Sequence, residues 1–265
     1  MLGHVVEGGD FAPLHIQTHV ICEPDKALEN VQNALSLPYP VLMDRTETVS
    51  ICGAGPSLAR TYSELKGDVM ACNSAIGWLH DKGVHLKSAM MFDAHPVMVK
   101  FARRIEGVKY YIASRCDPSL FEALKGMDIT VWHALGDDGL IEYLESKPLP
   151  RHKHGTCVMG GSAAVTRSIY LARALGYTDI HLYGADSSMA DGETHVNGSV
   201  VPEDAIEVYM LGKKYQTTKW MAAQAVEFQT LWKPVENTGC KVTVHGDGLL
   251  PDIWRFLSAT QRRSI

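Results

Sequence analysis

The sequence lacks an excess of basic charge. Its 25 Lys and Arg residues are outnumbered by 30 Asp and Glu residues, which gives a formal net charge of −5. Surfaces that bind DNA or RNA are normally basic, so general nucleic-acid binding is disfavoured. Long apolar runs are also missing, and none reaches the roughly 18 residues needed to cross a membrane. The first residues lack the basic and apolar regions of a signal peptide. We therefore expect no membrane span.

Paired cysteines are absent too. The six cysteines are scattered, and no Cys-x-x-Cys pair occurs. This usage is typical of reduced core cysteines in a cytoplasmic protein, because disulfide scaffolds and zinc sites use closely spaced cysteines. What the chain does have is length and apolar content. Its 265 residues, 46% of them hydrophobic, suffice for one large α/β domain or one domain with an extension.

Apolar strands alternate with helical segments through most of the chain. Strands are predicted at 48–52, 68–72, 88–92, 108–113, 128–133, 179–183 and 240–245. Helices are predicted at 57–66, 74–82, 96–105, 118–125, 137–146, 161–175 and 214–233. Strands that are buried on both faces read as continuous apolar runs between helices. The rhythm therefore predicts an α/β, doubly wound, mainly parallel sheet with helices on both faces.

Three segments depart from this rhythm. Residues 1–46 form an irregular N-terminal extension with one amphipathic helix over 25–36, and they are available to pack against a partner subunit in a homo-oligomer. Two long loops, near 147–160 and 184–212, are inserted into the domain at 47–265. Long loops inside compact domains are often lids or binding loops, so both are candidate parts of a site.

The run VSICGAGPSL at 49–58 predicts a buried strand, a glycine turn and a helix start. Glycine permits positive φ and the close approach of a ligand. A serine can cap the helix, whose N-terminus presents free N–H groups and a partial positive charge. A phosphate fits such a turn. The spacing matches neither Gly-x-Gly-x-x-Gly nor a P-loop, and a structural turn is the alternative. The candidate nucleotide-binding residues are Gly53, Ala54, Gly55, Pro56 and Ser57.

Polar residues also follow the other predicted strands, where ligands bind in open α/β sheets. Asn73 follows the second strand and is a candidate for contacting a base or ribose, or for capping a helix. Asp93 and Asp186 follow later strands, and each is a candidate for Mg²⁺ or ribose binding, or for a structural turn. Gly184 and His95 belong to the same set, as nucleotide-binding and substrate-binding candidates respectively.

The two long loops add charged candidates. Arg151 and His154 belong to a basic run in the first loop and suit an anionic substrate, with a solvated loop as the alternative. His195 lies in the second loop and is a candidate general base. Lys213, at the end of that loop, is a candidate for neutralising a phosphate. A solvated helix start is its alternative.

Three runs in a fixed order resemble a known family. They are GAGPSL after the first strand, CNS at 72–74 after the second, and ALGYTDIHLYGAD at 174–186. The pattern resembles the MptE-like family, named for an archaeal 6-hydroxymethylpterin diphosphokinase. It is also similar to the fold of the family 42 sialyltransferases and the flagellin motility accessory factors. The resemblance covers roughly residues 47–245, and the runs WMAAQAVEFQ and VHGDGLLPDI resemble those of bacterial and phage members.

The resemblance implies a Rossmann-like domain with a nucleotide at the glycine turn and in contact with Asn73. The chain also departs from the patterns of these families at two positions. The sialyltransferases place a catalytic histidine after a glycine that precedes a late helix, whereas here Gly212 is followed by Lys213, which leaves His195 as the substitute. The pterin kinases have an Asp-x-Asp-like Mg²⁺ site after the third strand, whereas here Asp93 is the only carboxylate.

Two classes of function follow. The first is a nucleotide-dependent transferase, glycosyltransferase-like with a nucleotide-sugar donor, with ATP-dependent, Mg²⁺-assisted pyrophosphoryl transfer as the alternative form. The expected partners are a small-molecule nucleotide donor and an acceptor whose identity the sequence does not indicate. The second class is a non-catalytic nucleotide-binding accessory protein. The candidate catalytic residues are His195, Lys213 and Asp186.

Overall fold

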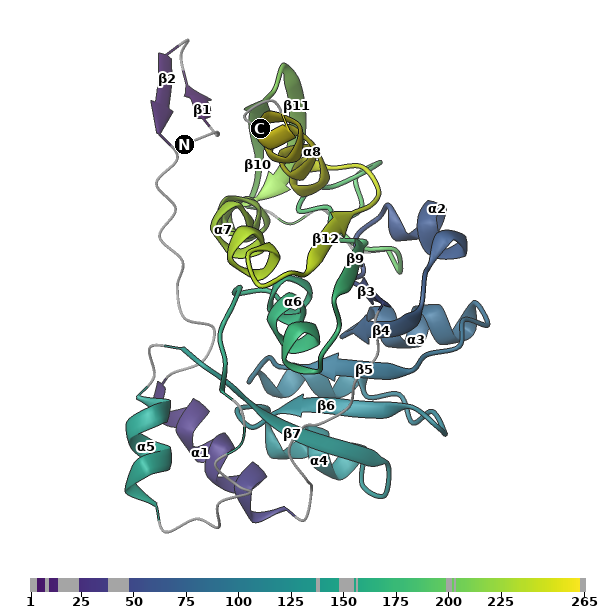
Figure 1. The fold of residues 1–265 in the computed structure, drawn as a ribbon, viewed down its shortest axis with the longest axis vertical. Coiled ribbons are helices and arrows are strands. Elements are labelled where there is room, and N and C mark those ends of the chain that lie inside the picture. The colour runs from purple at the N-terminus through teal and green to yellow at the C-terminus, as the bar shows by residue number, and fades with distance from the viewer. Residues whose placement is uncertain are drawn as a thin grey trace.

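The computed structural model describes residues 4–7, 10–13, 24–37, 48–136, 139–147, 155, 157–198, 202 and 204–262. Its centre is a sheet of eight parallel strands, in the order β12-β9-β3-β4-β5-β6-β7-β8. Figure 1 labels the strands of this sheet from β12 to β7. The strands are β3 (Thr48–Cys52), β4 (Asp68–Cys72), β5 (Ser88–Met91), β6 (Lys109–Ala113), β7 (Asp128–Ala134), β8 (Cys157–Val158), β9 (Asp179–Tyr183) and β12 (Lys241–Val244).

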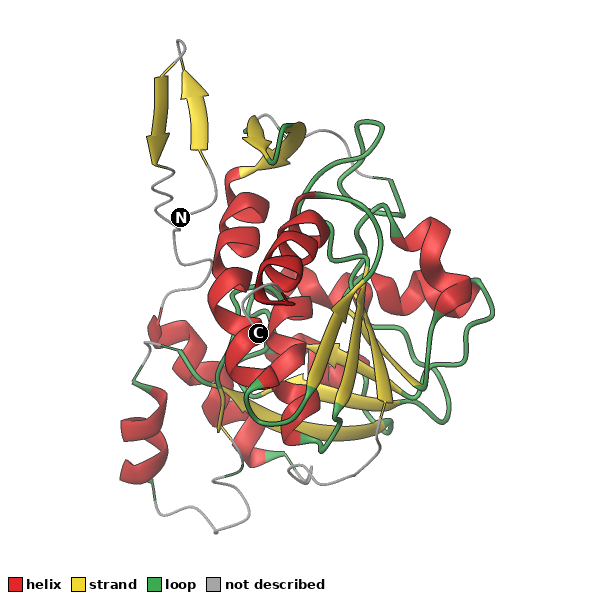
Figure 2. Cartoon of the chain, turned by 45° about the horizontal axis from the view of Figure 1, so that its top comes forward, coloured by secondary structure: helices red, strands yellow, loops and turns green. Residues whose placement is uncertain are grey.

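Helices pack along both sides of this sheet, so the prediction of a Rossmann-like α/β fold is confirmed (Figure 2). The α-helices are α1 (Pro24–Ser36), α2 (Leu58–Thr61), α3 (Ala75–Asp81), α4 (Pro118–Ala123), α5 (Leu140–Ser146), α6 (Ala164–Ala174), α7 (Lys219–Glu236) and α8 (Leu249–Arg262). Two 3₁₀ helices are η1 (Tyr62–Glu64) and η2 (Pro96–Phe101). Within the described residues, no helix is both long and apolar enough to span a bilayer.

The strands of the main sheet carry the core because their side chains are buried on both faces. In β3, β4, β6 and β9 only the first residue is partly exposed, and all four residues of β5 are buried. This burial explains the continuous apolar runs of the sequence, and it leaves the polar residues to the turns after the strands. A small satellite core, Val31 with Leu140 and Leu144, joins α1 to α5.

A second, antiparallel sheet corrects two expectations. It has the order β11-β10-β1-β2, with β1 (His4–Glu7), β2 (Asp10–Pro13), β10 (Ala205–Met210) and β11 (Lys213–Thr218). Residues 1–46 are therefore not irregular throughout, and the predicted loop at 184–212 contains a strand. Val208, Met210 and Tyr215 are buried while their neighbours along the strand are exposed, and this alternation is typical of a sheet with one solvated face.

The late helix also begins later than predicted. Residues 214–218 belong to β11, and α7 starts at Lys219, where the Thr218 hydroxyl caps it by accepting from the Met221 N–H at 3.2 Å. Leu211 and Gly212 form the hairpin turn, both with positive φ. Lys213 therefore follows a hairpin turn and lies at the start of a strand, which corrects the expectation of a helix start.

Candidate functional site

The strand order places a topological switch point between β3 and β9. From β3 the chain builds the sheet outward through β4 to β8, and β9 then returns to pair with the other edge of β3. Open α/β sheets bind ligands at such a point, beyond the carboxyl ends of the strands. A cavity of about 370 Å³ lies there, lined by the turns that follow β3, β4, β5 and β9. We call it the switch-point cavity.

Most of the predicted site residues gather around the switch-point cavity. Those that line it are Gly53, Ala54, Gly55, Asn73, Asp93, Gly184, Asp186 and His195. Ser57 and Lys213 instead line a neighbouring cavity of about 480 Å³, which has Asp186 in common with the first. Pro56 and His95 line neither cavity. Arg151 and His154 lie outside the described residues.

The glycine turn after β3 is packed against the turn after β9. The Gly53 N–H donates to the Tyr183 carbonyl at 2.9 Å, and the Gly55 N–H donates to the Gly184 carbonyl at 2.8 Å. A Cβ on Gly53 or Gly55 would lie 2.6 or 2.7 Å from the Gly184 oxygen. Of these three glycines only Gly184 has positive φ. Close backbone packing, and not the positive φ that we expected, thus accounts for glycine at positions 53 and 55.

Asp186 occupies one of the N–H groups that we expected a phosphate to meet. Its carboxylate accepts from the Ser57 N–H at 2.6 Å and from the Ser57 hydroxyl at 2.5 Å. The Ser57 side chain therefore does not cap α2, which has only four residues. Burial raises the pKa of Asp186 to about 6, and the two hydrogen bonds from Ser57 oppose that shift. The carboxylate ties the β9 turn to the β3 turn.

Asn73 presents an unsatisfied acceptor at the switch-point cavity. Its backbone has positive φ, which asparagine tolerates better than most residues. The side-chain oxygen is buried and has no hydrogen-bond partner, although the residue lines the cavity. A buried polar atom without a partner is costly, so a ligand that donates a hydrogen bond here would remove that cost.

Asp93 and His95 form a local turn. The Asp93 carboxylate accepts from the His95 N–H at 2.9 Å, and His95 Nδ1 accepts from the Val97 N–H at 3.1 Å, which caps η2. The Asp93 side chain thus has the structural turn role that the sequence left as its alternative, and it also lines the cavity. The helix cap formed by His95 is a role that the sequence did not predict. Among the described residues, no group of three or more His, Cys, Asp or Glu is arranged to hold a metal ion. Since both oxygens of Asp186 are bonded to Ser57, Asp186 does not fit Mg²⁺, and a metal role of Asp93 stays a prediction.

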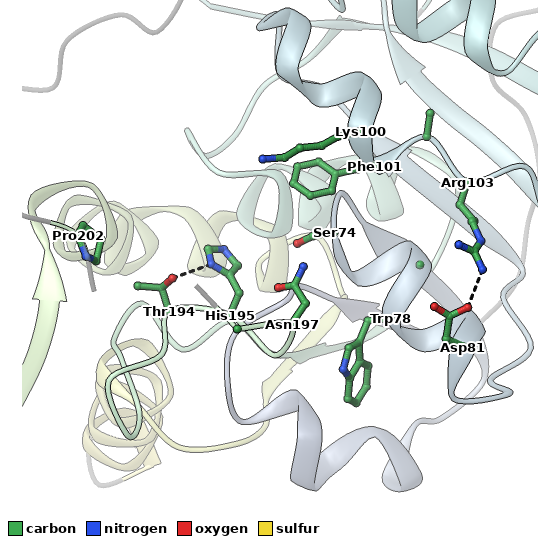
Figure 3. A pocket seen from close by; sticks show the side chains of 13 residues that line it. Ser74, Trp78, Asp81, Lys100, Phe101, Arg103, Thr194, His195, Asn197 and Pro202 are labelled. Atoms are coloured by element: carbon green, nitrogen blue, oxygen red, sulfur yellow. Dashed lines mark hydrogen bonds and ion pairs between the residues drawn. The ribbon is translucent and has the colours of Figure 1, made fainter. Parts of the chain in front are cut away.

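His195 is held at the cavity by its neighbours. The Val196 N–H donates to the Ala54 carbonyl at 2.8 Å, so the loop is attached to the glycine turn. His195 Nδ1 lies 3.0 Å from the Thr194 hydroxyl, and a dashed line in Figure 3 marks this contact. Desolvation and then the Lys100 ammonium lower the pKa of His195. Both effects favour the neutral imidazole, which can accept a proton.

Sequence reasoning missed part of the lining. Phe101, Met221 and Gln224 also face the switch-point cavity. Met221 lies among apolar neighbours in α7, a pattern that is typical of core packing. Phe101 lies in a segment that was predicted as a helix, and its proximity to His195 depends on how that segment crosses the loop. The run of polar residues after the strands was the usable signal, and these positions do not belong to it.

Comparisons with known proteins agree with this fold. The family model described as 6-hydroxymethylpterin diphosphokinase MptE-like matches residues 25–192. A solved structure, a MAf glycosyltransferase from Magnetospirillum magneticum AMB-1, superposes with a TM-score of 0.58 at 13% sequence identity. The match covers 91% of this chain but 42% of that one, so the likeness shows the fold. No curated protein matches. Because the family model spans well over half of the sequence, the chain belongs to the MptE-like family.

Proposed function

We propose that the protein is a glycosyltransferase-like enzyme that takes its donor, a sugar linked to a nucleoside monophosphate, in the switch-point cavity. The observation that carries the proposal is the buried, unpartnered oxygen of Asn73 at the cavity wall. This oxygen can accept a hydrogen bond from a ribose hydroxyl or from the amino group of a base. Membership of a family named for a diphosphokinase and the fold of a glycosyltransferase both support group transfer from a nucleotide.

The charge of the cavity favours a donor with little negative charge. Of the described residues that line it, none is Lys or Arg, while Asp93 and Asp186 contribute carboxylates. A triphosphate there would meet these carboxylates without a compensating cation, whereas one phosphodiester carries a single charge. The charge of the lining therefore favours sugar transfer over the ATP-dependent alternative.

In the proposed reaction, a hydroxyl group of the acceptor attacks the anomeric carbon of the donor sugar. The carbon–oxygen bond to the phosphate breaks, and the nucleoside monophosphate leaves with the bonding electrons. His195 accepts the proton of the attacking hydroxyl, for which its neutral state prepares it. Asp186 acts as a positioning residue that joins the two turns. Lys213 takes no part in this scheme, since it pairs with Asp252 at 2.9 Å in the neighbouring cavity.

A thermal-shift panel of CMP, CDP, UDP, ATP and GTP, each with and without Mg²⁺, tests the proposal. We expect a nucleoside monophosphate to raise the melting temperature without metal, since ligand binding stabilises the folded state. Stabilisation by ATP only with Mg²⁺ would instead favour pyrophosphoryl transfer. No shift with any nucleotide would overturn both forms. Binding without turnover of any donor would favour the accessory protein.

A matched pair of variants ties the shift to Asn73. Asn73→Gly keeps positive φ accessible and removes the unpartnered oxygen, so it should abolish most of the nucleotide-induced shift. Asp191→Gly removes an exposed side chain from another positive-φ position that does not line the cavity, and its shift should equal that of the parent protein. Equal shifts in both variants would remove Asn73 from the site.

A further inference from the structure

A larger cavity of about 780 Å³ adjoins the switch-point cavity, and the proposed donor does not use it. It lies between α3, η2 and the loop that carries His195 (Figure 3). Ser74, Phe101, Thr194 and His195 line both cavities. A molecule in the larger cavity would therefore share one wall, and one histidine, with the donor.

The walls of this larger cavity are aromatic. Trp78 projects from α3, and the Tyr62 ring meets it edge-on, with the ring centroids 5.4 Å apart and an interplanar angle of 89°. That contact favours a fixed orientation of the indole ring. Phe101, at the end of η2, forms a second aromatic wall. Two flat apolar surfaces of this kind suit a ring-shaped molecule.

Two cations line the same cavity, and they differ in their pairing. The Arg103 guanidinium donates to the Asp81 carboxylate at 2.8 Å, so its charge is compensated. The Lys100 ammonium lies 4.8 Å from the centroid of the Phe101 ring, and no carboxylate of the described residues pairs with it. Lys100 is therefore the cation that an incoming anion would meet.

We propose that this larger cavity binds the acceptor, and that the acceptor is a hydroxyl-bearing ring compound with a phosphate or carboxylate group that contacts Lys100. The ring would lie against Trp78 and Phe101. The hydroxyl to be glycosylated would point at the shared wall, where His195 faces the donor. This inference rests on the proposed function, because it assigns the second substrate of the same reaction.

The test uses the five tryptophans as reporters. In the full chain labelled with ¹⁵N-Trp, the Trp78→Phe variant identifies the indole signal of Trp78. Glucose 6-phosphate, glucuronate and uncharged glucose are titrated in turn, with and without CMP. We expect the Trp78 signal to shift with one or both anionic sugars and not with glucose. Comparison of the titrations with glucose 6-phosphate and with glucuronate shows whether the cavity binds a phosphate or a carboxylate.

Two lysine variants test the role of charge. Lys100→Gln should weaken binding of the anionic sugar by about tenfold, since a hydrogen bond to a charged group is lost. Lys125→Gln removes an equal charge from an exposed lysine that pairs with Glu122 and does not line the cavity, and it should bind like the parent. Dispersed indole signals in each spectrum confirm that the variant is folded.

Three outcomes would overturn the inference: no shift of Trp78 with either anionic sugar, equal binding of glucose, or equal affinity in Lys100→Gln. The proposed function fails separately. If CMP raises the melting temperature and no sugar moves Trp78, the donor site stands and the acceptor site is wrong. If the sugar binds and no nucleotide stabilises the protein, the proposed transfer is wrong and the larger cavity remains a sugar site.

Discussion

At the scale of single residues, Asp186 shows how one buried carboxylate can hold two turns together. The residue is 3% exposed, and both of its oxygens accept from Ser57. Desolvation would favour its neutral form, whereas the amide and hydroxyl of Ser57 favour its ionised form. The raised pKa means that the folded state holds this proton more tightly than the unfolded chain does.

Asp186→Asn should flatten the dependence of stability on pH. The parent pKa is about 6 in the folded state and 3.8 in the reference state, so this group's contribution is fully present below pH 4 and is lost as pH rises through 6. The loss is on the order of 3 kcal/mol at most. Asparagine can accept from the Ser57 N–H and donate to its hydroxyl, so the variant should fold.

Urea unfolding at several pH values between 4 and 7 measures this effect. Asp128→Asn removes a carboxylate from the exposed start of β7 and serves as the control for loss of one negative charge. If the free energy of unfolding depends on pH in Asp186→Asn as it does in the parent protein, another group governs this pH range.

Gly55→Ala tests why glycine is needed at the β3 turn. The added Cβ would lie 2.7 Å from the Gly184 carbonyl oxygen and 2.8 Å from the Asp186 carboxylate, so we expect a loss of about 1–3 kcal/mol in the free energy of unfolding. Gly77→Ala places a Cβ in α3 where no atom lies within 4 Å, and it should stabilise by up to about 1 kcal/mol. Denaturant unfolding measures the free energy of unfolding of both variants. Equal stabilities would refute the close-approach argument.

At the scale of elements, Arg167 joins α6 to the far edge of the sheet. Its guanidinium donates to the carbonyls of Gly161 at 2.8 Å, Leu135 at 2.7 Å and Val158 at 3.0 Å. It also lies 5.4 Å from the Phe92 ring centroid, beside the switch-point cavity. These bonds satisfy carbonyl groups at or just beyond the ends of β7 and β8, where the short last strand leaves few ladder bonds.

Arg167→Ala should lower the free energy of unfolding by about 3 kcal/mol or more, because three buried carbonyl groups lose a charged hydrogen-bond donor. Arg173→Ala removes the same side chain from an exposed position on the same helix, where it donates to the Thr238 hydroxyl, and should cost less than about 1 kcal/mol. Denaturant midpoints give both values. Similar losses would mean that Arg167 contributes no more than a surface arginine.

At the scale of the whole molecule, one core connects the first strand of the main sheet to the last helix. The same cluster of buried residues includes Val49 in β3, Trp132 in β7, Phe228 in α7 and Ile253 in α8. The hairpin of β10 and β11 contributes Val208 and Tyr215 to it. The inserted hairpin is thus part of the domain's packing and not an appended flap.

Residues 47–265 should therefore unfold in one cooperative transition. Elements that share a core lose their contacts together, so far-ultraviolet circular dichroism and tryptophan fluorescence should give the same melting midpoint. Two separated midpoints would instead indicate that the hairpin region or an edge of the sheet unfolds independently.

The sequence by itself determined the parallel sheet and the polar residues that follow its strands at the cavity. Strands buried on both faces must be apolar throughout, so they stand out, and the polar residues at their ends are confined to one edge of the sheet. Asn73, Asp93 and Asp186 were found in this way. The hairpin at 205–218 was missed because its half-exposed strands carry charged residues, so the first strand was predicted as part of a loop and the second as the start of a helix.

Only the tertiary structure decided what the candidate residues touch. It placed Asp186 on Ser57, set Gly55 against Gly184, and separated Lys213 from His195 by assigning them to different cavities. The larger cavity could not be predicted from the sequence either, because Trp78, Lys100 and His195 come together from a helix, a 3₁₀ helix and a distant loop. Contacts between residues so far apart depend on how elements cross, and local sequence patterns carry no record of that crossing.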